Sequence, residues 1–321
     1  MKNNFHVKVG SEKGIRQVVA NSQDSNFNHS TDYLDFLISI GHKIICLVIY
    51  EEEKPVALIT GFEQRGRFNT PLRLKLGDKF GPIPLIVDEK KDNLALLRFC
   101  KDVIIQKFKK NFFISKYAYL SVDTIEHKFF YQPYISLNRK PSMIISEFKK
   151  SCRNSISKAV KEGVNIRISE DISKLEEFLA STDIEGFDSP SESQEVIKLF
   201  KKVDKSINVE LWFSYYKKKP LSVAIIIKFK DKISLYYMRS SENARKLSVN
   251  NLLISSMIKN YVNTGFKYFY LGGLGFDIYG ELKGYGNFKK SFNPIIDKKS
   301  LLHKNHWTAH LLKAYNIILG K

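Results

Sequence analysis

The sequence has few of the residues that mark several common protein classes. Three cysteines occur in 321 residues, Cys46, Cys100 and Cys152, and no two of them form a CxxC pair. Zinc sites and disulfide frameworks need more cysteines at closer spacing, so we expect a reduced, cytoplasmic chain. The longest apolar run is IICLVIY at 44–50, far short of the roughly 20 residues that span a bilayer. Residues 1–14 contain no apolar segment, so no signal peptide is expected.

The signatures of covalent catalysis are absent as well. No GxSxG nucleophile elbow, no HExxH zinc motif and no pair of carboxylates at predicted strand ends occurs. His306 and His310 have the spacing of a metal pair, but no Cys, Asp or Glu lies near them, so no metal site is predicted. These absences favour a reaction that depends on positioning and on an oxyanion stabiliser, such as acyl transfer to an amine.

Positive charge, by contrast, is abundant. The formal net charge is +19, but only 10 of the 52 basic residues are arginine. A basic surface can bind nucleic acid, nucleotide-linked sugars or anionic membranes. Lysine is also the usual solvated cation, whereas bidentate phosphate binding favours arginine. The charge is therefore compatible with a polyanionic partner and with an ordinary solvated surface.

Hydrophobic periodicity predicts an α/β protein with mixed sheets. The same order, three strands, a helix and a strand, occurs in both halves. In the first half these elements are expected at 42–53, 54–66, 72–87, 92–110 and 117–123. In the second half they are expected at 207–219, 219–230, 232–241, 247–263 and 266–273. The repeat predicts two similar domains, at 1–141 and 142–297, although one continuous sheet is compatible with the same pattern.

Two amphipathic segments flank the second domain core. Residues 142–164 are predicted to form one cationic helix that ends at Gly163. This helix is either a solvated surface or the border of a cleft between the domains, aimed at phosphates. Residues 298–321 are predicted to be a C-terminal amphipathic helix that docks on the protein's own body, with peripheral membrane contact as the alternative.

Residues 270–292, YLGGLGFDIYGELKGYGNFKKSF, contain six glycines. Their spacing fits neither a P-loop nor a Rossmann fingerprint. Glycine directly after a strand lets another backbone or a substrate approach closely, so Gly272 and Gly273 predict a crowded strand exit. If the chain continues as a strand, Phe288 and Lys289 point to opposite faces, with Phe288 as the core anchor.

Three stretches carry a family resemblance: FKKSCRNSISKAVKEGV, YYMRSSENARKLSVNNLLISSMIKNYVNTGFKYFYLGG and YGNFKKSF. Their order resembles the FemABX aminoacyltransferases, double GNAT-fold enzymes that build peptidoglycan cross-bridges. The resemblance implies two tandem GNAT-like domains with a cleft between them. It also implies an aminoacyl-tRNA donor and a nucleotide-linked or lipid-linked cell-envelope precursor as acceptor. No cofactor is expected.

Two other functions stay open. A CoA-dependent N-acyltransferase of surface-polysaccharide sugars would use acyl-CoA as donor. Such enzymes usually hold the pyrophosphate on a glycine-rich turn, and residues 239–251 contain no glycine. The third function is a non-catalytic, basic module that binds RNA or another anion.

The resemblance also implies the roles of Lys289 and Arg153, and neighbouring residues complete the predicted site. Lys289 is expected to stabilise the developing oxyanion as the catalytic residue. Lys150 and Arg153 are expected to contact acceptor phosphates, and Tyr237 to orient the substrate beside Phe288, Gly272 and Gly273. No general base is identified, so the attacking amine would lose its proton to water or to the substrate.

Overall fold

The structure is a computed structural model, and it describes residues 5–65, 71–76, 85–87, 94–107, 126–181, 184–185, 190–202, 208–274 and 284–303. The chain divides into two compact units. Unit 1 comprises residues 1–130 and 298–321, and unit 2 comprises residues 131–297. The division falls within strand β6 (Glu126–Ser136). The domain boundaries expected from the repeat, at 141 and 297, stay a prediction.

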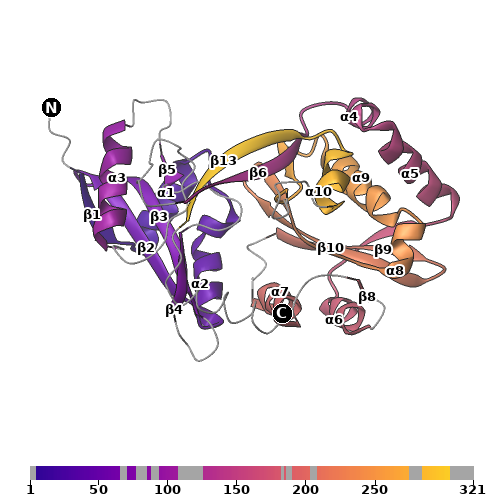
Figure 1. The fold of residues 1–321 in the computed structure, drawn as a ribbon, viewed down its shortest axis with the longest axis horizontal. Coiled ribbons are helices and arrows are strands. Elements are labelled where there is room, and N and C mark those ends of the chain that lie inside the picture. Colours follow the sequence, from indigo (N-terminus) through magenta and orange to yellow (C-terminus); the bar gives the residue numbers. More distant parts are fainter. Residues whose placement is uncertain are drawn as a thin grey trace. The chain divides into compact units, whose positions relative to one another are not determined.

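Unit 1 contains an antiparallel sheet with the strand order β1-β2-β3-β4, and β5 also pairs with β3 (Figure 1). Its elements in chain order are β1 (Phe5–Val9), α1 (Glu12–Asn21), the 3-10 helix η1 (Phe27–His29), α2 (Thr31–Ser39), β2 (Lys43–Glu51), β3 (Lys54–Arg65), β4 (Pro71–Leu76), β5 (Leu85–Ile86) and α3 (Leu94–Lys107).

Local chemistry starts and ends these elements. The hydroxyl of Ser11 accepts a hydrogen bond from the backbone N–H of Gly14 at 3.2 Å, and the hydroxyl of Ser30 accepts one from Tyr33 at 3.2 Å. Both serines therefore act as N-caps, of α1 and α2 respectively. Between β2 and β3, Glu52 adopts a left-handed φ of 53° that closes the predicted hairpin.

Alternation along β2 places its side chains on two covered faces. Leu47 and Ile49 pack with Cys100 of α3, whereas Val48 lies on the opposite face, close to Gly14 of α1. The unit 1 sheet is therefore buried on both faces, which explains why β2 reads as a nearly continuous apolar run.

Unit 2 contains the larger sheet, with the strand order β13-β6-β12-β11-β10-β9-β7 and β8 beside β11. Strands β11 and β12 are parallel, whereas the β6–β12, β10–β11, β9–β10 and β7–β9 pairs are antiparallel. Its elements after β6 are α4 (Pro141–Glu147), α5 (Lys150–Lys161), β7 (Asn165–Ser169), α6 (Ile172–Ala180), β8 (Ile184–Glu185), α7 (Pro190–Lys202), β9 (Asn208–Tyr216), β10 (Lys219–Phe229), β11 (Lys232–Ser241), α8 (Glu242–Lys246), α9 (Val249–Tyr261), β12 (Tyr268–Tyr270), α10 (Gly284–Lys290) and β13 (Ile295–His303).

Two hydrophobic clusters cover the two faces of this sheet. On one face α5 and α9 pack on the strands through side chains such as Cys152, Met257 and Phe269. On the other face α6 and α7 pack through side chains such as Phe178 and Val196. The odd and even residues of β9 and β10 are both buried, so these strands form the centre of the unit.

The predicted repeat of three strands and a helix is confirmed. Strands β2, β3 and β4 with α3 correspond to β9, β10 and β11 with α9. In each unit a strand and two helices precede these elements, β1, α1 and α2 in unit 1 and β7, α6 and α7 in unit 2. The elements between residues 5 and 39 were not predicted from the sequence. The predicted strand at 117–123 lies outside the described residues.

The cationic segment 142–164 is two helices and not the single helix that was predicted. Phe148 and Lys149 have extended ψ angles of 147° and 146° and separate α4 from α5. The Phe148 ring turns into the core and lies 5.2 Å from the ring of Phe292. The burial of this ring at the junction explains the break. Gly163, with a φ of 81°, follows α5 as predicted.

The C-terminal part of unit 2 also differs from the sequence-based expectation. Phe288 and Lys289 lie in helix α10, so the strand alternation expected for them is wrong. Residues 295–303 form strand β13, where the C-terminal helix was expected to begin at residue 298. The rest of that predicted helix, 304–321, lies outside the described residues.

Candidate functional site

The parallel strands β11 and β12 of unit 2 separate after a short contact. They pair only from Lys232 opposite Tyr268 to Ser234 opposite Tyr270. Beyond this point residues 271–274 follow β6, because Leu271 N–H donates to the carbonyl of Pro133 at 2.9 Å and Leu274 N–H donates to Tyr131 at 2.9 Å. Strand β11 instead continues alongside β10 to its end. The divergence opens the sheet at the predicted strand exit.

A β-bulge lies in β11 directly after this divergence. Ile225 of β10 pairs with Tyr237, whereas the next residue, Ile226, pairs with Leu235, so Tyr236 is the extra residue. A bulge twists its strand and turns side chains away from strict alternation. As a result, both Tyr236 and Tyr237 contact the cluster around α6 and α7, whereas strict alternation would place them on opposite faces.

The glycines at the strand exit are needed for the path of the backbone. Gly272 has a φ of 74°, in the left-handed region that an L-residue enters only at a cost. The carbonyl of Gly273 accepts a hydrogen bond from the Lys289 Nζ at 2.7 Å. The exit is thus tied to α10, which returns to it after the remainder of the glycine-rich segment.

Lys289 is a half-buried cation. Burial lowers the pKa of its ammonium from 10.5 to about 8. The Nζ lies 5.4 Å from the centre of the Tyr285 ring, in cation–π contact. Phe288 packs against the core on the side of α5 and α9, with its ring 5.3 Å from that of Phe292. Phe288 therefore anchors α10, and Lys289 is held by a carbonyl and an aromatic face.

The beginning of α5 lies against the end of α10. The N–H of Lys149 donates to the carbonyl of Ser291 at 2.9 Å. The guanidinium of Arg153 donates to the carbonyl of Ser146 at 2.9 Å and also to that of Phe148, so it caps the end of α4. Lys150 is exposed in the first turn of α5. The structure thus connects Lys150 and Arg153 to the elements that carry Lys289.

Tyr237 lies apart from these residues, on the sheet face covered by α6 and α7. Its ring is buried, and its hydroxyl accepts a hydrogen bond from the Nε of Arg239 at 3.1 Å. The Arg239 guanidinium also lies 5.1 Å from the Tyr237 ring, and burial lowers the pKa of Arg239. Arg239 was not among the residues predicted for the site. Its position two residues after Tyr237 on one strand was the available signal.

The turn between β11 and α9 uses its own backbone donors. The N–H of Ser248 donates to the carbonyl of Arg245, and that of Leu247 to the carbonyls of Asn243 and Arg245. The carbonyl of Lys246 accepts a hydrogen bond from the Nζ of Lys158 at 2.7 Å. These N–H groups are therefore not directed outward, as the donors of a phosphate-binding turn are.

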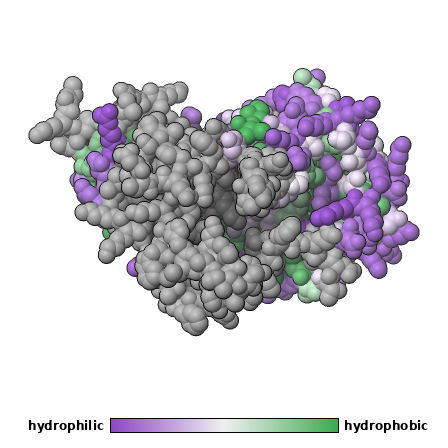
Figure 2. All heavy atoms as spheres, viewed as in Figure 1, coloured by the Kyte–Doolittle hydropathy of each residue, from purple (hydrophilic) through white to green (hydrophobic). Residues whose placement is uncertain are grey.

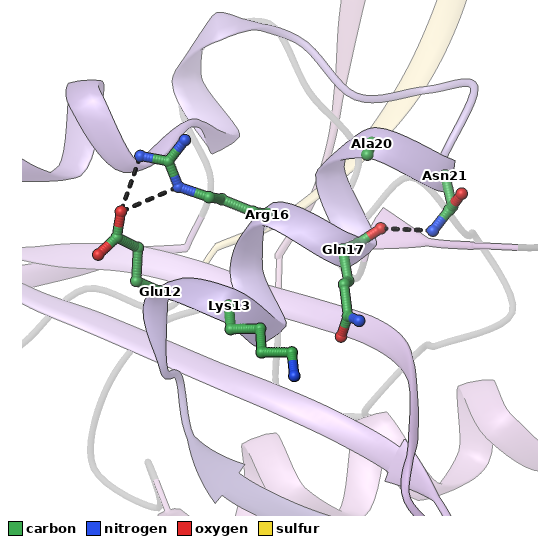
Figure 3. A pocket seen from close by; sticks show the side chains of 6 residues that line it. All are labelled: Glu12, Lys13, Arg16, Gln17, Ala20 and Asn21. Carbon is green, nitrogen blue, oxygen red and sulfur yellow. Dashed lines mark hydrogen bonds and ion pairs between the residues drawn. The ribbon is translucent and has the colours of Figure 1, made fainter.

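A hollow of about 530 Å³ lies on the α1 surface of unit 1 (Figure 3). Arg16 pairs with Glu12 at 2.7 Å, and the side chain of Asn21 donates to the carbonyl of Gln17 at 2.9 Å. Glu12, Arg16 and Asn21 thus have partners within α1, and none of the predicted site residues lines this hollow.

Within the described residues no three or more His, Cys, Asp and Glu side chains are grouped so that they could hold a metal ion. No helix there is long and apolar enough to cross a bilayer.

Comparison with known proteins identifies the fold. Residues 146–290 match the model of the family described as acetyltransferase (GNAT) domain. No curated protein sequence matches the chain. Among solved structures, the chain is similar to FemX, with 13% identity, a TM-score of 0.66, and coverage of 96% of this chain and 99% of that chain.

Two further structures cover both units. L-PGS from Bacillus licheniformis matches with 14% identity, a TM-score of 0.54 and coverage of 98% of each chain. A tandem GNAT protein from the clavulanic acid biosynthesis pathway matches with 7% identity, a TM-score of 0.52, and coverage of 94% of this chain and 99% of that chain. The predicted α/β fold with two tandem GNAT-like domains is confirmed. The cleft expected between the domains stays a prediction.

Proposed function

We propose that the chain is a transferase that moves an aminoacyl group from aminoacyl-tRNA onto an amine of a cell-envelope precursor. The acceptor would be a peptidoglycan precursor or a nucleotide-linked sugar peptide, and the reaction would take place in the cytoplasm. The observation that carries this proposal is the half-buried Lys289, held by the Gly273 carbonyl at the point where β11 and β12 separate. The similarity of the fold to FemX supports it.

The proposed chemistry needs a positive charge and no covalent nucleophile. The acceptor amine bonds to the ester carbonyl carbon of the donor, and the carbonyl oxygen gains negative charge. The Lys289 ammonium stabilises this charge in a partly dry site, where electrostatic interactions are stronger than in water. Collapse of the intermediate breaks the bond to the ribose oxygen, which takes up the proton that the amine loses.

Acceptor phosphates would bind at the beginning of α5. The N-cap residue Lys149 makes no side-chain cap, so the first N–H groups of the helix and its dipole favour an anion. Lys150 lies in the first turn. Arg153 uses one nitrogen for the α4 carbonyls, and its fork has further N–H donors for a phosphate. The Lys149–Ser291 hydrogen bond joins this helix end to the residues that follow Lys289.

The β11–α9 turn favours tRNA over CoA as the source of the transferred group. The N–H groups of Leu247 and Ser248 are used within the turn, and Ser248 takes a left-handed φ of 55° where glycine would be expected. A CoA-dependent N-acyltransferase of polysaccharide sugars is the second candidate, because residues 146–290 match an acetyltransferase domain family.

The donor is tested by comparing acyl-CoA with charged tRNA. Calorimetry should detect no low-micromolar binding of acetyl-CoA. Incubation with charged tRNA and a UDP-linked sugar peptide should yield the aminoacylated peptide, detected by mass spectrometry. Low-micromolar affinity for acetyl-CoA, together with acetylation of a sugar amine, would replace the tRNA proposal with the CoA alternative.

A further inference from the structure

Three segments that are far apart in the sequence meet at one end of the large sheet, where β11 ends. The strand registers place the turn between β9 and β10 there, because Ser222, near the start of β10, pairs with Ser240 of β11 and with Ser214 of β9. They also place the start of β7 there, because Asn165 pairs with Tyr215 of β9. Helix α5 ends directly before β7, and α8 follows β11. The end of α5, the β9–β10 turn and α8 are therefore neighbours.

Each of these segments carries exposed lysine or arginine. We call the set the basic rim: Lys158 and Lys161 of α5, Lys217, Lys218 and Lys219 at the β9–β10 turn, and Arg245 and Lys246 of α8. The Nζ of Lys158 donates to the carbonyl of Lys246 at 2.7 Å, which joins α5 to α8, and α8 also contacts β10. Hydrophilic residues cover this end of unit 2 in Figure 2, where α5 and α8 lie in Figure 1.

Carboxylates at the rim are fewer than cations. Glu162 at the end of α5 and Glu242 of α8 are both exposed, and Glu242 lies 4.0 Å from Lys246. Glu185 of β8 pairs through its backbone with Ser240. The basic rim keeps a net positive charge when these three are counted, so it attracts a polyanion.

The width and composition of the rim indicate which polyanion it fits. It follows the ends of β7, β9, β10 and β11, which is about 14 Å at 4.8 Å per strand, wider than the phosphates of a single mononucleotide. Lysines act as point charges that contact backbone phosphates without reading bases. The large apolar side chain exposed in these segments is Val160 alone, whereas a helix on a bilayer inserts a whole apolar face. The rim therefore favours the backbone of RNA over a membrane.

The basic rim and the strand exit lie towards the same end of the sheet. Strands β11 and β12 are parallel, so their carboxyl ends point the same way. From Ser234, the last residue of β11 paired with β12, to Ser241 at its end is about 20 Å at 3.3 Å per residue. A charged tRNA carries its ester on a short single strand beyond its duplex. A duplex bound at the rim would leave this ester within reach of the Lys289 ammonium.

We propose that the basic rim binds the phosphate backbone of an RNA duplex. Binding of RNA stands on the rim alone, whereas the identification of this RNA as the body of the donor tRNA rests on the proposed function. Because the contacts are made to phosphates, binding should be independent of sequence and should weaken steeply with salt.

The test is fluorescence anisotropy of the full chain with a labelled RNA hairpin that has a single-stranded 3′ end, at several KCl concentrations. Lys161→Gln/Lys218→Gln/Lys246→Gln should weaken binding at low salt by about tenfold or more, and should reduce the salt slope by about one for each lost phosphate contact. K161R/K218R/K246R keeps the charge and should bind like the wild type. Lys158 stays unchanged because it joins α5 to α8.

A matched control removes the same charge elsewhere. Lys13 of α1, Lys43 of β2 and Lys259 in the last turn of α9 are exposed and lie outside the rim. The variant Lys13→Gln/Lys43→Gln/Lys259→Gln should bind the hairpin nearly as well as the wild type. No binding by the wild type, or equal losses in the two glutamine variants, would overturn the proposal. Binding to phosphatidylglycerol vesicles that the rim variant abolishes, without RNA binding, would overturn it in favour of a membrane.

Transfer kinetics keep this inference separate from the proposed function. The glutamine variant of the rim should raise the KM for charged tRNA by about tenfold, and should not change it for a charged oligonucleotide too short to form a duplex. Transfer by the wild type, with RNA binding that the rim variant does not change, contradicts the rim and leaves the function intact. Rim-dependent RNA binding without transfer contradicts the function and leaves the rim intact. The altered lysines are exposed, so melting temperatures should match the wild type. If the triple variant melts early, Lys161→Gln alone gives the same comparison with a smaller loss.

Discussion

The two units share one order of elements and differ where the third strand of the repeat meets its neighbours. In unit 1 the place beside β3 is filled by two separate pieces, β4 and β5. In unit 2 the corresponding strand, β11, is continuous, carries a bulge and parts from β12. A returning helix, α10, then brings Lys289 to the strand exit. The shared scaffold alone does not make a site. The polar residues placed at the divergence distinguish unit 2.

The comparison is tested most strongly by removing the half-buried cation, Lys289. Lys289→Met should lower kcat by about a hundredfold, because a missing oxyanion stabiliser typically costs about 3 kcal/mol. Lys290→Met, one residue along α10, should change kcat little. Steady-state kinetics of both variants measure the difference.

Stability should move in the opposite direction from activity. Burial disfavours the charged lysine in the folded state, so Lys289→Met should keep or raise the melting temperature at pH 7. A Lys289→Met protein that is folded and retains the wild-type kcat would contradict the role given to Lys289.

Arg153 and Lys150 test whether the beginning of α5 binds the acceptor. Arg153→Ala should raise the KM for a phosphate-bearing acceptor by about tenfold or more, because a bidentate contact with a phosphate stabilises binding more than a solvated charge does. It should also lower stability by about 1–2 kcal/mol, because the α4 carbonyls lose their donor. Lys150→Ala should raise the KM less and leave the melting temperature unchanged. An unchanged KM in both variants would assign this helix to the solvated surface.

The pH dependence of kcat tests whether the Lys289 ammonium takes part in catalysis. The Lys289 pKa of about 8 lies below its ordinary value, so the ammonium is present below that pH and is lost above it. We expect kcat to fall by up to about tenfold per pH unit above pH 8. In Lys289→Arg the guanidinium stays protonated at these pH values, so the residual kcat should not fall above pH 8. A wild-type profile that is flat to pH 10 would exclude the ammonium from catalysis.

The smallest expected effects come from two glycines, one in each unit. Gly272 has a φ of 74° and Gly41 a φ of 90°, so an alanine at either position should cost about 1–2 kcal/mol. Gly272→Ala should also lower kcat by about tenfold, because the Gly273 carbonyl that holds Lys289 would shift. Gly41→Ala, in an open turn of unit 1, should lower the melting temperature only. Equal kcat values for Gly272→Ala and Gly41→Ala would show that the strand exit has no role in catalysis.

Much of the fold follows from periodicity. Strands β9, β10 and β11 and helices α3 and α9 lie where the apolar pattern predicts them, because burial fixes both strand and helix faces. Helix α10 was misread as a strand. Gly284, Tyr285, Gly286 and Asn287 have weak helix propensity, and the contact of Phe288 with Phe292 is tertiary information.

The candidate site follows the sequence less closely. Lys289 was identified through a resemblance, and its contact with Gly273 spans the glycine-rich segment, which no local pattern encodes. The bulge at Tyr236 places Tyr237 among α6 and α7 side chains. Alternation alone would place Tyr237 on the opposite face of the sheet. In the sequence Arg153 looks like a surface cation, yet it also caps the end of α4. The sequence pattern did not distinguish α4 from α5.

The short contact between β11 and β12 has a mechanical consequence for unit 2. Three residue pairs join the ribbon β7-β9-β10-β11 to the ribbon β12-β6-β13, whereas β10 and β11 share eight. The large sheet therefore consists of two ribbons joined by the short β11–β12 contact, and this contact lies next to the strand exit. A ligand that contacts both ribbons would keep them from separating. Hydrogen exchange at Ile233 and Phe269 would then slow on binding more than exchange at the centre of β10.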